Sequence, residues 1–254
     1  MRPILFHLGN LAVPSFWVMA FLGFFAAFAV IRSDLLRRGF EPALAYDTTL
    51  YAYIGGWVGA RLFLIPSAWN YFTQDPLGFL VMSSGWVWYG GLLGGALAVV
   101  MLARERHIPF LVMMDVLAPA AAIGLGVGRI GCQLAGDGDY GIPSTLPWAM
   151  SYPRGVVPTS ERVHPAPIYE AVACFLIFAY LWHQRHHERH PGDLTGRYFI
   201  LAAVARFLIE FVRRNPAWLA GLTTAQWTSV GLAVAGLLLM RRNFAPATSH
   251  RPQP

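Results

Sequence analysis

The sequence contains no lysine and has few charged residues of any kind, since Asp, Glu, Lys and Arg together make up only 13% of its 254 residues. All 19 basic residues are arginines, and they are scattered among apolar segments. Without a basic tract or stripe, a nucleic-acid partner is not expected. The formal net charge of +6 instead suits contact with anionic lipid headgroups.

Cysteine is also scarce, with Cys132 and Cys174 in different segments. Neither belongs to a CxxC pair or to a metal-ligand spacing, so the cysteines predict no metal centre. A structural disulfide is not expected, because Cys174 lies in the middle of an apolar segment. The first residues lack the shape of a cleavable signal peptide and contain no lipobox cysteine. We therefore expect the first apolar segment to be retained as a membrane anchor.

What is abundant is apolar surface: 56% of the residues are hydrophobic, and the mean hydropathy is +0.47. These values are too high for a soluble domain of this size and predict a polytopic membrane protein. We expect an all-α fold in a single transmembrane domain covering residues 1–254. Seven spans are predicted, at about 13–31, 47–65, 85–103, 111 to the glycine-rich stretch, 168–182, 197–212 and 224–240. Residues 66–84 are expected to form a polar, aromatic loop.

Arginines are more frequent at alternate ends of these spans. The richer ends are Arg32–Arg38, Arg104–Arg106, Arg185–Arg189 and Arg241–Arg242. By the positive-inside rule these ends are cytoplasmic. The pattern predicts an N-terminus outside the cell, a C-terminus in the cytoplasm, and an outward-facing glycine-rich stretch.

That glycine-rich stretch runs from Gly124 to Gly141 and contains Arg129. An arginine within a hydrocarbon-length segment is costly and needs an anionic partner. The partner could be a carboxylate, with Asp115, Glu170 and Asp137 as candidates, or a ligand phosphate. Glycines allow backbones or a headgroup to approach closely, and the guanidinium fork suits phosphate. We therefore predict a lipid-phosphate site here.

A second charged group lies in the sixth predicted span, where Arg206, Glu210 and Arg213 follow i, i+4, i+7 spacing and share one helix face. They could form a buried ion pair. Because two arginines face one acid, we favour the alternative, in which one arginine is left for a ligand phosphate. Arg61 is also deep in its span, and an ion pair and a ligand role are equally compatible with it.

Several separated motifs, in order, resemble the bacterial prolipoprotein diacylglyceryl transferase family along nearly the whole chain. They are Gly59-Ala60-Arg61, Tyr89-Gly90-Gly91-Leu92-Leu93-Gly94, Asp115-Val116-Leu117-Ala118-Pro119, Gly128-Arg129-Ile130-Gly131 within the Gly124–Gly141 stretch, His164-Pro165 with Tyr169-Glu170, and Arg206-Phe207 with Glu210-Phe211.

The resemblance implies a cofactor-independent enzyme of the bacterial inner membrane, working at its outer face. Such an enzyme moves the diacylglyceryl group of phosphatidylglycerol onto the lipobox cysteine thiol in a prelipoprotein signal peptide, and glycerol phosphate leaves. It also implies that Arg129 binds the lipid phosphate and that Arg206 is essential. We therefore predict catalytic roles for Arg206, Tyr89, Glu210 and Asp137, and substrate-binding roles for Arg129, Arg61, Gly90, Gly91, Gly141 and Cys132.

The sequence departs from the best-studied pattern of this family at several positions. Tyr89 replaces a histidine, Cys132 an asparagine and Phe16 a tyrosine, and one extra residue separates Asp137 from Tyr140. A tyrosine with an ordinary pKa of about 10 is a poor base, so Asp137, Asp139 or Glu210 is the better candidate to accept the thiol proton. The departures also support an alternative, a paralogue with altered or lost activity that binds phospholipid.

Overall fold

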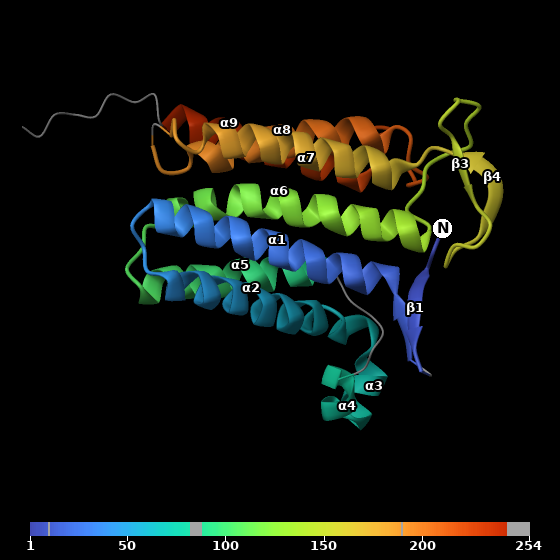
Figure 1. Ribbon diagram of the computed structural model, residues 1–254, viewed down its shortest axis with the longest axis horizontal. Coiled ribbons are helices and arrows are strands. Elements are labelled where there is room, and N and C mark those ends of the chain that lie inside the picture. Colours follow the sequence, from blue (N-terminus) through green and yellow to red (C-terminus); the bar gives the residue numbers. More distant parts are fainter. Residues whose placement is uncertain (10, 82–87, 189, 243–254) are drawn as a thin grey trace, which may run out of the picture. The chain divides into compact units, whose positions relative to one another are not determined.

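A computed structural model describes residues 1–9, 11–81, 88–188 and 190–242. The described chain is mostly helical (Figure 1). The expected all-α fold needs one correction, because two small antiparallel sheets accompany the helices. One pairs β1 (Ile4–Leu8) with β2 (Leu11–Pro14), and the other pairs β3 (Met150–Tyr152) with β4 (Thr159–Val163).

Each predicted span corresponds to a helix of 18 residues or more, with ends that differ by a few residues. These helices are α1 (Ser15–Arg37), α2 (Pro42–Leu62), α5 (Trp88–Glu105), α6 (Phe110–Ala135), α7 (Ala166–Gln184), α8 (Asp193–Glu210) and α9 (Thr224–Arg242). Among the described residues, α1, α6 and α7 are long and apolar enough to cross a membrane. For the other four helices, membrane spanning stays a prediction.

The segment expected to be a loop, residues 66–84, is instead largely helical where it is described. It contains the 3-10 turn η1 (Ile65–Ser67) and the short helices α3 (Trp69–Gln74) and α4 (Pro76–Val81). Asp75 precedes α4, and its Oδ1 accepts the backbone N–H of Gly78 at 2.8 Å. An Asp cap followed by proline is a favourable helix start, and this local signal explains α4.

The chain divides into two compact units, and residues 31–113 form one of them. Within this unit α2 and α5 pack through glycines. A Cβ added to Gly59 would lie 2.3 Å from the carbonyl oxygen of Gly90, and one added to Gly94 would lie 2.2 Å from that of Gly55. Side chains at these positions cannot be accommodated without moving a helix, so the glycines set the distance between the two helices.

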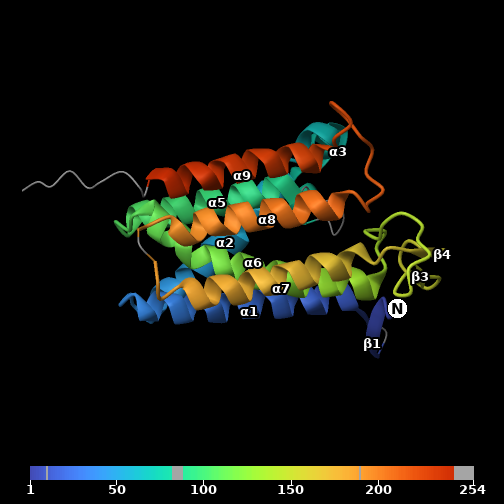
Figure 2. The ribbon, with the colours of Figure 1, turned by 90° about the horizontal axis from the view of Figure 1, so that it is seen from above.

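The other unit contains residues 1–30 and 114–254. In it, α8 runs between α7 and α9 (Figures 1 and 2). An apolar cluster joins α6, α7 and α8, made of Ala118, Ala122, Ile177, Leu181 and Leu194. Glycines again allow close crossings, since a Cβ on Gly126 of α6 would lie 2.8 Å from the Phe175 ring of α7.

The start of α8 is fixed by Asp115, a fully buried carboxylate of α6. Its oxygens accept hydrogen bonds from the N–H of Gly192 at 2.5 Å, the N–H of Thr195 at 2.8 Å and the Thr195 hydroxyl at 2.7 Å. A carboxylate at a helix N-terminus satisfies free N–H groups and favours the helix dipole. Asp115 therefore links α6 to the start of α8.

Candidate functional site

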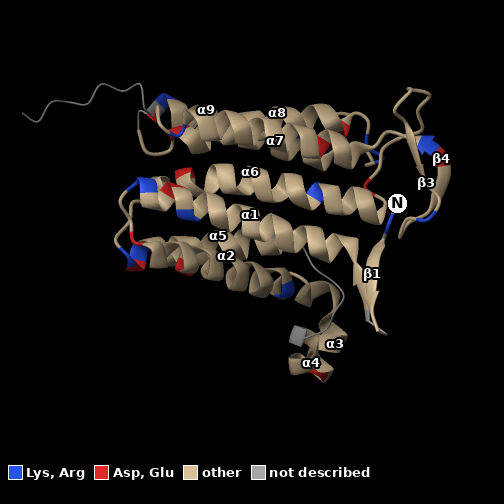
Figure 3. Ribbon diagram, viewed as in Figure 1, with Lys and Arg blue, Asp and Glu red and all other residues tan. Residues whose placement is uncertain are grey.

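The helix α6 continues through the glycine-rich stretch to Ala135 and places Arg129 and Cys132 on its last turns. The middle turns of the long helices carry few charged residues (Figure 3). Arg129 forms ion pairs with Asp139, on the loop after α6, and with Glu170 of α7, whose Oε2 lies 2.5 Å from the Arg129 Nε. The partners of Arg129 thus come from two other parts of the chain, and neither Asp115 nor Asp137 is among them.

Glu170 is the centre of the charged group. Besides Arg129, its carboxylate accepts hydrogen bonds from Arg206 Nη1 at 2.9 Å and from Arg213 Nη1 at 3.0 Å. Its side chain is only 7% exposed. A buried carboxylate that serves three guanidinium groups compensates charge in an apolar setting, where an unpaired charge is costly.

Glu210, the last residue of α8, is also buried. Its Oε2 lies 2.8 Å from Arg206 Nη2. Its Oε1 accepts hydrogen bonds from the Asn215 side-chain amide at 2.7 Å and the Thr223 hydroxyl at 2.8 Å. These contacts hold the Glu210 carboxylate where it positions Arg206.

Arg213, just after α8, lies between Glu170 and Asp139. Its Nη2 donates to Asp139 Oδ1 at 2.8 Å, while the other Asp139 oxygen faces Arg129. Burial raises the pKa of the Asp139 carboxyl, but the charges of Arg213 and Arg129 outweigh burial and hold that pKa below its ordinary value. Asp139 is therefore ionised at neutral pH.

We call these six residues the arginine network: Arg129, Arg206 and Arg213 with Asp139, Glu170 and Glu210. Its formal charges balance. This corrects the interpretation favoured from the sequence, in which one of Arg206 and Arg213 is left without an acid, because Glu170 and Asp139 reach both arginines from other elements.

The loop that carries Asp139 is shaped by glycines. Gly136 and Gly138 have φ values of 60° and 96°, a region that favours glycine. A Cβ on Gly141 would lie 2.1 Å from the Val212 carbonyl oxygen. Next to Gly141, the N–H of Ile142 donates to that same oxygen at 2.8 Å. Close packing thus accounts for glycine at position 141, and the loop is attached to the chain after α8.

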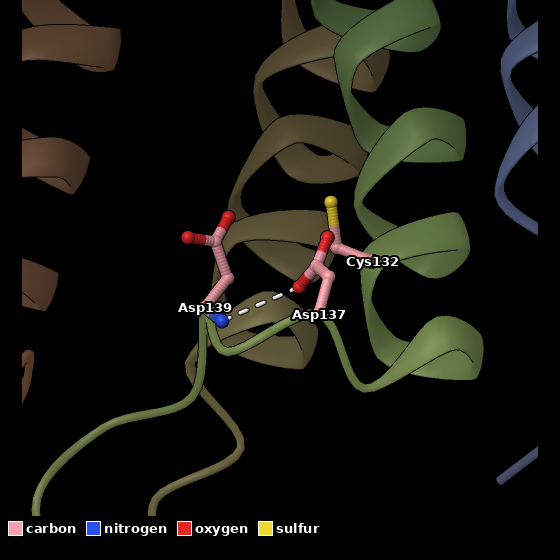
Figure 4. Close-up of side chains that lie close together, drawn as sticks. All are labelled: Cys132, Asp137 and Asp139. Carbon is pink, nitrogen blue, oxygen red and sulfur yellow. Dashed lines mark hydrogen bonds between the residues drawn. The ribbon is translucent and has the colours of Figure 1, made fainter. Parts of the chain in front are cut away.

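Cys132 and Asp137 lie next to Asp139 of the network, and each of the three has one potential ligand atom within 4.8 Å of the others. Figure 4 shows the Asp137 carboxylate turned toward the Cys132 thiol. Two arginines pair with Asp139, and Arg129 Nη1 lies 3.9 Å from the Cys132 sulfur. These positive charges disfavour a cation at this place. Both cysteines are free thiols, as expected.

The remaining predicted site residues belong to the unit formed by residues 31–113. Arg61 is buried, at 1% exposure, near the end of α2. Gly90 and Gly91 lie on α5 and face α2, where a Cβ on Gly90 would meet the Gly59 carbonyl oxygen at 2.4 Å. Helix packing therefore accounts for Gly90. Tyr89 lies in the first turn of α5.

Sequence reasoning gave Glu170 only as one of three possible partners for Arg129, and it left Arg213 out of the site. A signal existed for both, since each is a charged residue beside an apolar run. Asn215 and Thr223 were missed, because nothing in a polar loop sequence shows which side chains turn toward a buried carboxylate.

The fold and the site define the class of protein: a helical membrane protein in which arginines and carboxylates from separate elements meet in one charged site. Comparison with known proteins identifies the family. The family model described as prolipoprotein diacylglyceryl transferase matches residues 3–242. The chain therefore belongs to the prolipoprotein diacylglyceryl transferase family.

Relatives named phosphatidylglycerol–prolipoprotein diacylglyceryl transferase are similar along nearly their full length. The protein from Clostridium tetani is 30% identical over 94% of this chain and 96% of its own. The protein from Geobacter sulfurreducens is 33% identical over 98% of this chain and 96% of its own. The protein from Chromohalobacter salexigens is 33% identical over 93% of this chain and 90% of its own. The chain is an enzyme of the transferase class, and its family acts in lipoprotein biosynthesis.

Proposed function

We propose that this protein transfers the diacylglyceryl group of phosphatidylglycerol to the lipobox cysteine thiol of a prelipoprotein signal peptide. A thioether forms and glycerol phosphate leaves. The family and its named relatives support the reaction. The structural observation that carries the proposal is the arginine network, in which guanidinium groups from α6 and α8 share one carboxylate, Glu170. We propose that residues 1–254 act as one transferase domain.

In this proposal Arg129 and Arg206 act on the phosphate of the lipid. Planar guanidinium groups suit phosphate oxygens. When the bond between the glyceryl carbon and the phosphate oxygen breaks, the departing group gains negative charge. Donors already fixed around that charge stabilise the transition state more than the ground state. Glu170 and Glu210 hold both arginines in place, so the donors are oriented before the reaction begins.

The attacking thiol must lose its proton, because a free thiol is only partly ionised at neutral pH. Of the three candidate bases, Glu210 and Asp139 are held by guanidinium groups. Asp137 makes no ion pair with any residue that the structure describes, and it lies next to Cys132. We therefore propose Asp137 as the base. Cys132 then lines the place where the substrate thiol approaches.

For the residues of the other unit, the proposal follows the family resemblance. We propose that Arg61, Gly90 and Gly91 contribute to substrate binding, together with Gly141, and that Tyr89 assists catalysis. Tyr89→Phe should slow transfer without abolishing it, since a phenol is a weak base at neutral pH. A much larger loss of transfer activity would indicate that the Tyr89 hydroxyl takes a direct part in proton transfer.

We propose that all seven long helices span the bacterial cytoplasmic membrane, with the N-terminus outside, the C-terminus in the cytoplasm, and the arginine network toward the outer face. The arginine-rich helix ends support this orientation. Lipobox cysteines of exported prelipoproteins reach the outer side, so a site there would meet both substrates.

The test combines purified protein, phosphatidylglycerol and a lipobox peptide, with the peptide followed by mass spectrometry. Wild type should add one diacylglyceryl mass to the cysteine, while Arg129→Ala and Arg206→Ala should not. Normal turnover by Arg129→Ala would refute the site.

Tyr89, Cys132 and Phe16 favour one other candidate function, a paralogue that binds phospholipid without transferring it. Rescue of a strain depleted of its own transferase separates the two functions. Rescue supports the transferase. Failure to rescue, with phosphatidylglycerol still bound by the purified protein, supports the paralogue.

A further inference from the structure

We propose that Asp139 is a built-in competitor of the lipid phosphate, holding Arg129 and Arg213 until a phosphodiester displaces it. This inference rests on the proposed function and deepens it. It names Asp139 as a residue that determines which lipids bind, and it adds Arg213 to the groups that receive the phosphate.

Asp139 bridges the two arginines. One carboxylate oxygen, Oδ1, accepts from Arg213 Nη2 at 2.8 Å, and the other, Oδ2, faces Arg129 Nη1. A phosphodiester carries the same single negative charge and likewise presents two non-bridging oxygens, one for each guanidinium. The Asp139 carboxylate and a phosphodiester therefore both match the charge and the donor geometry of the two arginines. Only one of these anions can occupy the donors at a time.

The three carboxylates of the network differ in burial. The Asp139 side chain is 34% exposed, against 7% for Glu170 and 0% for Glu210. Glu170 bonds three arginines, and its removal would leave buried positive charge without compensation. Asp139 can exchange its partners for water, which makes it the carboxylate that yields most readily.

The exchange needs only a rotation of the Asp139 side chain. The loop backbone is attached on both sides of Asp139: the N–H of Val157 donates to the Gly136 oxygen at 2.9 Å, and the N–H of Gly141 donates to the His164 oxygen at 2.8 Å. An aspartate has alternative staggered χ1 rotamers. Rotation would free both guanidinium groups while the loop stays in place.

The consequence is selection by charge. A neutral diacyl lipid offers no anion to exchange with Asp139, so it gains nothing from the two arginines. A phosphodiester replaces the lost interactions. Because Asp139 occupies the donors for part of the time, the apparent affinity for phosphatidylglycerol is lower than the intrinsic affinity.

The experiment measures binding of phosphatidylglycerol with a fluorescent acyl chain to the full-length protein in detergent micelles. The variants are Asp139→Asn and, as a control, Glu161→Gln, which removes the same charge from an exposed carboxylate outside the arginine network. Diacylglycerol with the same chains tests the need for phosphate. Competition by soluble glycerol phosphate tests whether the phosphate-bearing group binds at this site without the acyl chains. Thermal unfolding of each variant, with and without phosphatidylglycerol, is recorded in parallel.

Asp139→Asn should lower the Kd for phosphatidylglycerol about fivefold and enlarge the upward shift in unfolding temperature that this lipid causes. Glu161→Gln should leave the Kd within about twofold of wild type, because exposed charges contribute little. If Asp139→Asn does not fold, Asp139→Ser removes the same charge and should lower the Kd in the same direction. If Asp139 has only a structural role, its substitution should raise the Kd for phosphatidylglycerol, because a damaged site binds more weakly.

An unchanged or higher Kd in the folded Asp139 variants would overturn this inference alone, provided that wild type prefers phosphatidylglycerol to diacylglycerol. If wild type shows no such preference, the proposed function fails, and this inference fails with it. Stronger competition by glycerol phosphate in Asp139→Asn than in wild type would support the exchange and show that the phosphate group is sufficient for it.

Discussion

In residues 31–113 the helices α2 and α5 meet through glycines, whereas in residues 1–30 and 114–254 the helices α6, α7 and α8 meet around charges as well as through an apolar cluster. The first arrangement depends on the absence of side chains, and the second on side chains that compensate one another. A glycine contact should therefore fail when any atom is added. A charged contact should fail when one partner is removed, and by more, since the remaining charges are buried.

The largest effect is expected for Glu170→Gln. The change leaves three arginines facing two carboxylates, and breaking a buried ion pair on one side costs about 3–5 kcal/mol. We expect a fall in unfolding temperature and loss of transfer by more than about a hundredfold. Glu161→Gln is the control, since its carboxylate is exposed and pairs only with Arg214 among the described residues. Equal stability of the two variants would contradict the central place of Glu170.

Next in size is Gly59→Ala in the glycine contact. The added Cβ would lie 2.3 Å from the Gly90 oxygen, and overpacking of this kind costs about 1–3 kcal/mol. Gly231→Ala in α9 is the matched control, because a Cβ there meets nothing within 4 Å. Since alanine favours helix over glycine, the control should be neutral or slightly stabilising. Both are measured by thermal unfolding in detergent.

A similar loss of stability is expected when the start of α8 loses its cap. Asp115→Ala removes an acceptor of three hydrogen bonds, and buried donors left without a partner cost about 1–3 kcal/mol. Thr195→Val removes only the hydroxyl contact and should cost less. If Asp115→Ala unfolds like wild type, the link between α6 and α8 does not depend on this cap.

These helices show what the sequence could and could not foretell. All seven long helices were predicted, because apolar runs of span length are a strong local signal. The helix α4 was missed, although Asp75 and Pro76 mark its start. The partners of Arg129 are Asp139 and Glu170, which lie on other elements of the chain. Which carboxylates reach the arginine depends on how these elements pack together, and no local sequence pattern encodes this packing. Asp115, Glu170 and Asp137 were equal candidates in the sequence, yet Asp115 caps α8 and only Glu170 pairs with the arginine.

The smallest effect concerns pH. The lowered pKa of Asp139 means that its ion pairs stabilise the fold above its ordinary value of 3.8, and that this contribution is lost as the pH falls through the lower folded value. Between about pH 5 and 8, Asp139 should add no pH dependence to the unfolding temperature. Below about pH 4, wild type should lose stability more steeply than Asp139→Asn. Parallel curves would contradict the two ion pairs of Asp139.

The most direct measurement of the central claim, that guanidinium groups of α6 and α8 contact the lipid phosphate, is the phosphorus-31 NMR resonance of phosphatidylglycerol titrated with the protein in micelles. We predict that wild type shifts and broadens this resonance, and that Arg129→Ala and Arg206→Ala each largely abolish the change while remaining folded. A resonance that responds equally to wild type and to both variants would contradict the account.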